Sequence, residues 1–356
     1  MSDNSIQAVF DYHQATKHGY DRYAAGPGYL DWDSQPNPFR RYDGARMIHL
    51  EKTPPTDEPR YDDAFVDGRI APVPVSMRSI SQLLYDSLAI SAWKSVEETR
   101  WALRVNPSSG NLHPTEGYLI CGPIDGLATA PMVCHYAPKE HALEVRAEFD
   151  LRLWQQLCGR FPPGTFFTGL TSIHWREAWK YGQRAYRYCQ HDAGHAIGAI
   201  SIAAAGLGWQ ARILDDLGTD ELGLLMGISG DCEAGPKGRA EAEEPDVLIA
   251  VAPSGRQMEE TELPGDPIRI FAALDWRGTP NQLSASHVGW GMEEIAEAAR
   301  KGRSRRCEWS ADPVKPWLLD ARPLSLRRMI RQRRSAVAMD GETSISREAF
   351  YHILQK

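Results

Sequence analysis

The sequence lacks any ordered arrangement of cysteine. None of its six cysteines stands in a CxxC pair, and they are scattered along 356 residues. They are Cys121, Cys134, Cys158, Cys189, Cys232 and Cys307. This pattern indicates neither a disulfide framework nor a cysteine zinc site. The expected compartment is therefore the cytoplasm.

Long apolar runs, a secretory leader and an excess of positive charge are missing as well. The longest apolar run, residues 196–209, is too short to span a bilayer. Residues 1–19 lack the basic start and apolar stretch of a secretory signal. The formal net charge of −7 argues against a protein that mainly binds nucleic-acid phosphate. We therefore expect neither a membrane nor a nucleic acid among the partners.

What is present is enough apolar material for a full core. With 42% hydrophobic residues, the chain can form one large domain with appendages or two domains. Residues 1–75 are rich in Pro, Gly, Asp and aromatic side chains, which predicts an extended N-terminal arm lying over the core. The globular part then begins near residue 76.

Helical and strand patterns interleave after residue 76. Residues 79–93 have leucines near helical spacing after a serine that can cap a helix. A second, longer helix is predicted for residues 183–208, where many Ala and Gly residues would allow close backbone approach. Strands are predicted at residues 117–121, 141–146 and 246–253. Together these patterns indicate an α+β class.

A polar turn precedes the first of these strands. Ser108, Ser109 and Gly110 follow Pro107, and Asn111 adds an amide. Such a turn can direct its backbone N–H groups to one side and suits an anionic or carbonyl-rich ligand. The alternative is an ordinary surface turn.

Two further motifs belong to this region, one inside the long predicted helix and one just before it. The run HDAGH places His191 and His195 four residues apart, as in a zinc protease helix, but Asp192 replaces the glutamate that such an enzyme uses. We therefore predict structural histidines in a packed layer and no metal. Upstream, Lys180 and Tyr181 put an amine beside a phenol, which could exchange a proton or simply form a solvated helix start.

An arginine-rich stretch lies near the C-terminus. Residues 323–336 form a predicted helix that carries Arg327, Arg328, Arg331, Arg333 and Arg334 and leads to Ser335. Its composition fits a nucleic-acid patch, a solvated face or a phosphate clamp. A short amphipathic helix capped by Ser346 should follow.

Taken together, these motifs resemble the nitroreductase-like flavoprotein superfamily, and within it the SagB-type, azoline-dehydrogenase-like branch. The resemblance is carried by YHQATKH and LDWDSQPNPFRRY in the arm, NPSSGNLHPTEGYL in the turn and KYGQRAYRYCQHDAGHAIGAISIAAAGLGW in the helix. It covers most of residues 11–255. It implies an FMN enzyme of α+β fold, with a mixed sheet flanked by helices and flavin sites at the interface of two like units.

The resemblance also implies roles for particular residues. In such proteins one unit provides a turn that reaches the flavin, and the matching residues here are Pro107, Ser108, Ser109 and Asn111. The other unit begins with an element that grips the FMN phosphate, and its counterpart here is Arg333, Arg334 and Ser335. Lys180 and Tyr181 look like the Lys-Tyr pair that azoline dehydrogenases use as a base.

One departure from the family pattern suggests how the chain is divided. Where the first unit should carry its own arginine element, the sequence has Tyr85 and Asp86, and an aspartate there would repel a phosphate. We therefore expect a nitroreductase-like domain at residues 76–320 and the start of a second, incomplete unit at residues 321–356. The assembly would be a homodimer or a tandem pseudo-dimer.

The expected function is FMN-dependent, two-electron dehydrogenation or reduction of a small molecule or a modified peptide, with an azoline or a nitro compound as possible substrates and NAD(P)H as a possible electron donor. The alternative is a degenerate member of the same fold that has lost flavin and binds a protein or peptide partner.

Overall fold

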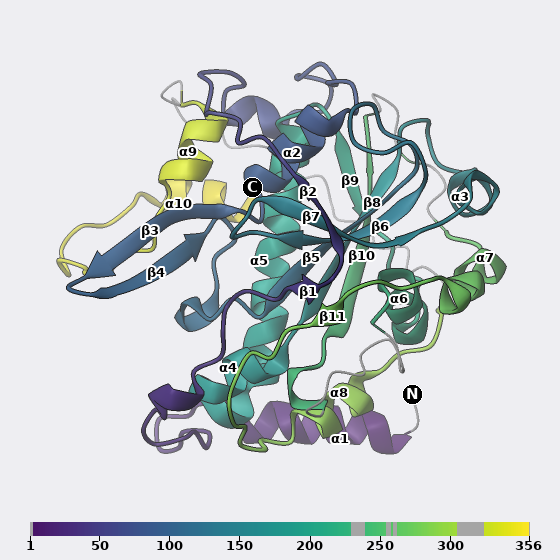
Figure 1. Cartoon of the computed structure of the whole chain (residues 1–356). Coiled ribbons are helices and arrows are strands. Elements are labelled where there is room, and N and C mark those ends of the chain that lie inside the picture. Colours follow the sequence, from purple (N-terminus) through teal and green to yellow (C-terminus); the bar gives the residue numbers. More distant parts are fainter. Residues whose placement is uncertain (1–2, 229–238, 254–257, 259–261, 305–323, 356) are drawn as a thin grey trace.

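A computed structural model describes residues 3–228, 239–253, 258, 262–304 and 324–355. Its centre is a seven-stranded sheet in the order β2-β7-β6-β5-β8-β10-β9 (Figure 1). These strands are β2 (Arg46–His49), β5 (Thr115–Cys121), β6 (Met132–Ala137), β7 (Ala142–Glu148), β8 (Phe166–Ser172), β9 (Gln210–Ile213) and β10 (Glu244–Ala252). All the described pairings are antiparallel, so the sheet is antiparallel where a mixed sheet was expected.

Helices cover both faces of this sheet, which confirms the α+β class. One face packs on α2 (Met77–Tyr85) and the long α5 (Ala185–Ala205), with Leu119, Leu170 and Ile249 in the shared core. The other face packs on α3 (Leu151–Cys158), α6 (Thr219–Met226) and α7 (Gly265–Ile270), with Ile120, Phe167 and Leu248 in the core. Side chains on successive strand positions alternate between the two cores, as the period of a strand requires.

The remaining elements surround this body. They are α1 (Asp3–Ala15), α4 (His174–Tyr181), α8 (Met292–Ala299), α9 (Leu326–Gln332), α10 (Arg347–Gln355), the hairpin β3 (Ile90–Val96) with β4 (Thr99–Arg104), and the short pair β1 (Tyr42–Asp43) with β11 (Thr279–Pro280). Figure 1 shows α9 and α10, in yellow, beside the β3–β4 hairpin. No helix in the described part of the chain has both the length and the apolar character needed to cross a membrane.

Two sequence predictions about elements are wrong. The arm is not extended throughout, because it begins with helix α1 and contains strands β1 and β2. The helix predicted for 79–93 ends at Tyr85, and its cap is Ser76, whose hydroxyl accepts a hydrogen bond from the Ser79 amide. Residues from Ile90 onward form a strand instead, because pairing with β4 outweighs a weak helical spacing. The Ser346 cap is confirmed, since its hydroxyl accepts from the Ala349 amide.

Candidate functional site

The polar turn has an unusual backbone. Gly110, Asn111 and His113 all have φ between +55° and +62°, a region that is rare for residues with side chains and that needs support from the surrounding structure. That support comes from within the chain. The Ser108 hydroxyl accepts a hydrogen bond from the His113 amide at 2.8 Å, and the Asn111 amide group donates to the Ala102 carbonyl at 2.9 Å.

A carboxylate on α5 holds the turn from the other side. The Ser109 amide donates to both carboxylate oxygens of Asp192, at 3.0 and 3.1 Å, and the Ser109 hydroxyl donates to the same group at 3.0 Å. Asp192 is completely buried. Both Ser109 donors are therefore bonded to an acid of this chain and are not free for a ligand.

The predicted Lys-Tyr pair lies directly against this turn. A Cβ placed on Gly110 would come within 2.7 Å of the Tyr181 hydroxyl and 3.1 Å of the Lys180 amine. Lys180 Nζ also lies 5.6 Å from the centre of the Tyr181 ring. Burial raises the pKa of Tyr181 to about 12. Only a glycine leaves room for this approach.

The arginine segment reaches the same place from the C-terminal end. Arg333 follows α9, and its guanidinium donates to the carbonyl of Val105 at 3.0 Å, two residues before Pro107. Arg334 donates to the carbonyls of Arg331 and Arg333. Within the described part of the chain, neither Arg333 nor Arg334 forms an ion pair, and both are exposed together with Ser335. Their donors match a phosphomonoester in charge and geometry.

The expectation that Asp86 would repel a phosphate is wrong, because its charge is neutralised. Asp86 accepts from Arg327 of α9 at 2.6 Å, and both side chains are buried. The Arg331 guanidinium lies 3.9 Å from the centre of the Tyr85 ring and donates to the carbonyls of Tyr85 and Ile90. Arginines of α9 thus occupy the position where the first unit was expected to have its own.

A buried ionic network fixes helix α4 under the site. Arg176, on the first turn of α4, forms a very short ion pair with Glu116 of β5 and donates to the carbonyl of His113 at 2.7 Å. His135 of β6 bridges Glu116 and Glu144, at 3.1 and 2.9 Å. Although burial alone would lower it, the two carboxylates raise the pKa of His135 to about 9.

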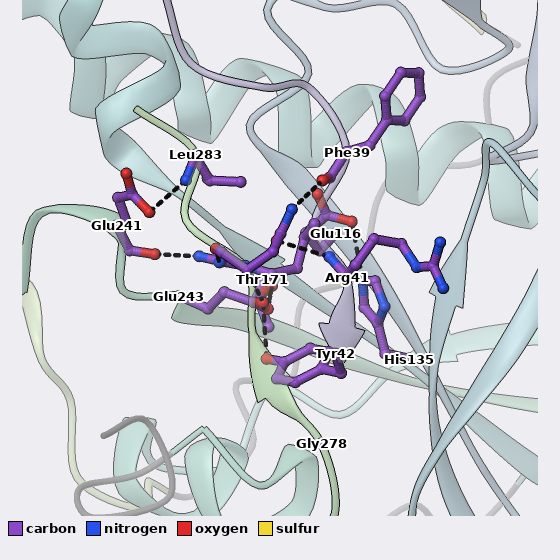
Figure 2. A network of polar contacts seen from close by, with 12 residues as sticks. Phe39, Arg41, Tyr42, Glu116, His135, Thr171, Glu241, Glu243, Gly278 and Leu283 are labelled. Atoms are coloured by element: carbon purple, nitrogen blue, oxygen red, sulfur yellow. Dashed lines mark hydrogen bonds and ion pairs between the residues drawn. The ribbon is translucent and has the colours of Figure 1, made fainter. Parts of the chain in front are cut away.

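The network continues across the sheet to strand β1 and the residue before it, Arg41 (Figure 2). Glu243 accepts from Tyr42 at 2.9 Å, from Tyr118 at 2.8 Å and from Thr171 at 2.6 Å, and Arg41 binds Glu144 at 2.6 Å. Each carboxylate of this network, Glu116, Glu144 and Glu243, therefore has donors around it, as burial of charge requires. Because Arg176 belongs both to this network and to α4, the network sets the position of Lys180 and Tyr181.

The HDAGH run contributes through its second residue, Asp192. His191 and His195 are exposed on α5, so the prediction of packed structural histidines is wrong. In the described part of the chain, no group of three His, Cys, Asp or Glu side chains could hold a metal ion. Sequence reasoning missed Asp192 and Glu177 as site residues. Asp192 was noticed only as a departure from a zinc motif, although an acid inside an Ala- and Gly-rich, packed helix is itself a signal for a buried polar contact.

Comparison with solved structures identifies the fold of this chain, whereas comparison of sequences finds no match. No family model and no curated protein matches the chain. A solved structure described as a nitroreductase from Anabaena variabilis superposes with a TM-score of 0.62 at 21% identity, covering 94% of this chain. This chain spans 65% of the length of that structure.

Two further solved structures give lower scores. One, described as a nitroreductase from Ralstonia eutropha, has a TM-score of 0.41 at 16% identity, covering 65% of this chain and 97% of its own. The other, an E. coli microcin synthetase McbBCD complex with truncated pro-MccB17 bound, has a TM-score of 0.39 at 16% identity, covering 70% and 93%. Scores this low establish no shared fold. The Anabaena structure shows that this chain has a nitroreductase-like fold.

Proposed function

On this nitroreductase-like fold, we propose that the protein is an FMN-dependent oxidoreductase that dehydrogenates or reduces a small molecule or a modified peptide. One observation supports the proposal above all others. Three segments far apart in sequence meet at one place: the Ser108–Asn111 turn, the Lys180–Tyr181 pair and the exposed Arg333–Ser335 segment. Each of them resembles a flavin-site or catalytic element in sequence.

The residues present fit the cofactor chemically. Arg333, Arg334 and Ser335 would hold the phosphate through charge-assisted hydrogen bonds. The turn would hold the remainder through exposed backbone at Gly110, whose missing side chain already permits close approach. Bound FMN would supply two-electron redox chemistry, while the protein supplies binding, orientation and electrostatics.

The Lys180–Tyr181 pair would handle the proton that accompanies electron transfer. With its pKa raised to about 12, Tyr181 keeps its proton at neutral pH, so it can donate a hydrogen bond that orients a substrate. Lys180 is then the group that takes or returns a proton at the substrate. Partial burial of both side chains limits the access of water.

The finer features of the proposal concern substrate and assembly. An azoline in a modified peptide and a nitro compound reduced with NAD(P)H both need two-electron chemistry beside a proton-exchanging pair. We also propose a cytoplasmic location. A homodimer or a tandem pseudo-dimer would provide the second unit, of which residues 321–356 would be the start.

A flavin-free binding protein is the second candidate, favoured by one observation. Asp192 already accepts both Ser109 donors, so the turn is satisfied without a ligand.

A visible absorption spectrum of the purified protein, with chromatography of whatever is released on denaturation, separates the two candidates. Stoichiometric FMN, or its uptake by the colourless protein, supports the oxidoreductase. A protein that stays colourless in excess FMN supports the binding protein and contradicts the proposal.

A further inference from the structure

Glu177 is a fully buried acid that receives no hydrogen bond from a donor among the described residues. Its side chain is 0% exposed, and no donor in the described part of the chain reaches either carboxyl oxygen. Among those residues, neither an arginine nor a backbone amide donates to it. An ionised carboxylate in that state would be very unfavourable, because it has lost water and gained no hydrogen bond.

The group that faces Glu177 is a second acid. Asp192 of α5 is a hydrogen-bonding neighbour of Glu177, and its negative charge raises the pKa of Glu177. Two carboxyl groups can form a hydrogen bond only when one of them carries a proton. The pair therefore needs one proton to be satisfied, a count that follows from geometry and burial.

Their surroundings decide which acid keeps the proton. Asp192 accepts three hydrogen bonds from Ser109, and such donors favour its ionised form. His195 lies 3.9 Å from it. The cation that acts on Glu177 among the described residues is Lys180. Burial together with Asp192 raises the pKa of Glu177 well above the ordinary value. The groups facing the pair are Lys180, Tyr181, Cys189, His195 and the Ser108–Ser109 turn.

We propose that Glu177 and Asp192 share one proton as a carboxyl–carboxylate pair, and that this pair positions the Ser108–Asn111 turn against Lys180 and Tyr181. Glu177 donates its O–H to Asp192, and Asp192 accepts from Ser109. Glu177 also lies three and four residues before Lys180 and Tyr181, so all three share one face of α4. Glu177 is a positioning residue: it acts on the turn through Asp192.

The pair makes the turn sensitive to pH. When Glu177 loses its proton, two facing anions repel each other, and Asp192 can no longer remain both buried and bonded to Ser109. The turn then loosens. The pair itself is a property of the protein without ligand, whereas its effect on cofactor binding rests on the proposed function.

Infrared difference spectroscopy of the ligand-free protein tests the pair directly. We expect a protonated-carboxyl C=O band at pH 7 that shifts in D2O and is lost in Glu177→Gln, whose amide can still donate to Asp192. Asp192→Asn should shift the band without removing it, because Glu177 stays buried while the acceptor of its proton changes from a carboxylate to an amide. Glu148→Gln, a control at a partly exposed acid paired with Arg46, should leave the band unchanged. No difference in this band between the wild type and Glu177→Gln, or a band that Asp192→Asn leaves unshifted, would overturn the proposal.

A binding measurement adds the functional consequence. In the wild type, FMN affinity should fall as pH rises and Glu177 ionises, whereas in Glu177→Gln it should stay constant over the same range. Equal pH dependence in the two proteins contradicts the positioning role. If neither protein binds FMN, the proposed function fails while the infrared result still decides whether the proton is shared.

Discussion

Arg327 of α9 donates to Asp86, just beyond α2, at 2.6 Å, with both side chains almost completely buried. The remaining Arg327 donors go to the carbonyls of Pro54 and Thr53, at 2.7 and 2.9 Å. The pair joins residues 241 positions apart in sequence and attaches the C-terminal arginine segment to the main body. The placement of Arg333 beside the turn depends on it.

Removing one partner of this pair should strongly destabilise the fold. Arg327→Ala leaves Asp86 buried without its cation, and we expect the free energy of unfolding to fall by about 3–5 kcal/mol. Urea denaturation followed by circular dichroism measures the change. Arg328→Ala is the matched control, because its 2.8 Å pair with Asp57 is solvent-exposed and should contribute less than about 1 kcal/mol. Equal effects of the two substitutions would refute the structural role.

The buried histidine should make stability depend on alkaline pH. The folded-state pKa of His135 is about 9 against an ordinary 6.5, so its stabilisation is complete below pH 6.5 and is lost as pH rises through 9. The difference corresponds to roughly 3 kcal/mol. In the wild type, the denaturation midpoint should be higher at pH 6 than at pH 9. His135→Asn should flatten the dependence, and an unchanged slope in that variant would assign it to other groups.

A methyl group on Gly110 should disturb the site more than the fold. In Gly110→Ala the new Cβ meets the Tyr181 hydroxyl and the Lys180 amine, so we expect loss of turnover with about 1 kcal/mol of destabilisation from the positive φ. Gly44→Ala is the control: it has φ +88° and nothing within 4 Å of the new Cβ. It should show similar strain and normal turnover. Normal turnover in Gly110→Ala would show that turnover does not depend on the close contact between the turn and the Lys-Tyr pair.

The arginine segment should recognise a phosphate specifically. Replacing both Arg333 and Arg334 by Gln should weaken FMN binding by about 1.5–3 kcal/mol per guanidinium group, which is at least about tenfold for each. Riboflavin, which lacks the phosphate, should bind the variant and the wild type alike. Fluorescence titration measures both ligands, with the exposed Arg347→Gln as control. A parallel loss of riboflavin binding would mean that these arginines do not act on the phosphate.

Lys180 should be needed for turnover and not for cofactor binding. We expect Lys180→Ala to retain its flavin and to lose substrate oxidation or reduction by roughly 10²–10⁴-fold, the range for a positioned proton-transfer group. Flavin content and steady-state rates measured on the same preparation separate the two effects. Tyr181→Phe keeps the ring that packs on Tyr188, 4.5 Å between centres, and tests the hydroxyl alone. Unchanged rates in both variants would remove the pair from the mechanism.

Much of the fold could be predicted because local patterns carry it. Strands β5, β7 and β10 are apolar runs bounded by polar segments, and α5 is long enough to show its composition clearly. The failures occurred where pairing partners are distant. Residues 90–96 are a strand because β4 pairs with them, and residues 3–15 form a helix that packs near α8, far along the chain (Figure 1).

The sequence by itself determined the α+β class, the separate motifs and the types of side chain that each contributes, because these depend on near neighbours in the chain. Tertiary structure alone decided that Gly110 meets Lys180 and Tyr181, that Arg327 neutralises Asp86, and that Glu177 faces Asp192. Those relationships depend on how α4, α5 and α9 pack, and no local pattern encodes a contact between two segments that are remote in sequence. The charge state of a buried acid follows from its neighbours in space, so only the folded chain fixes it.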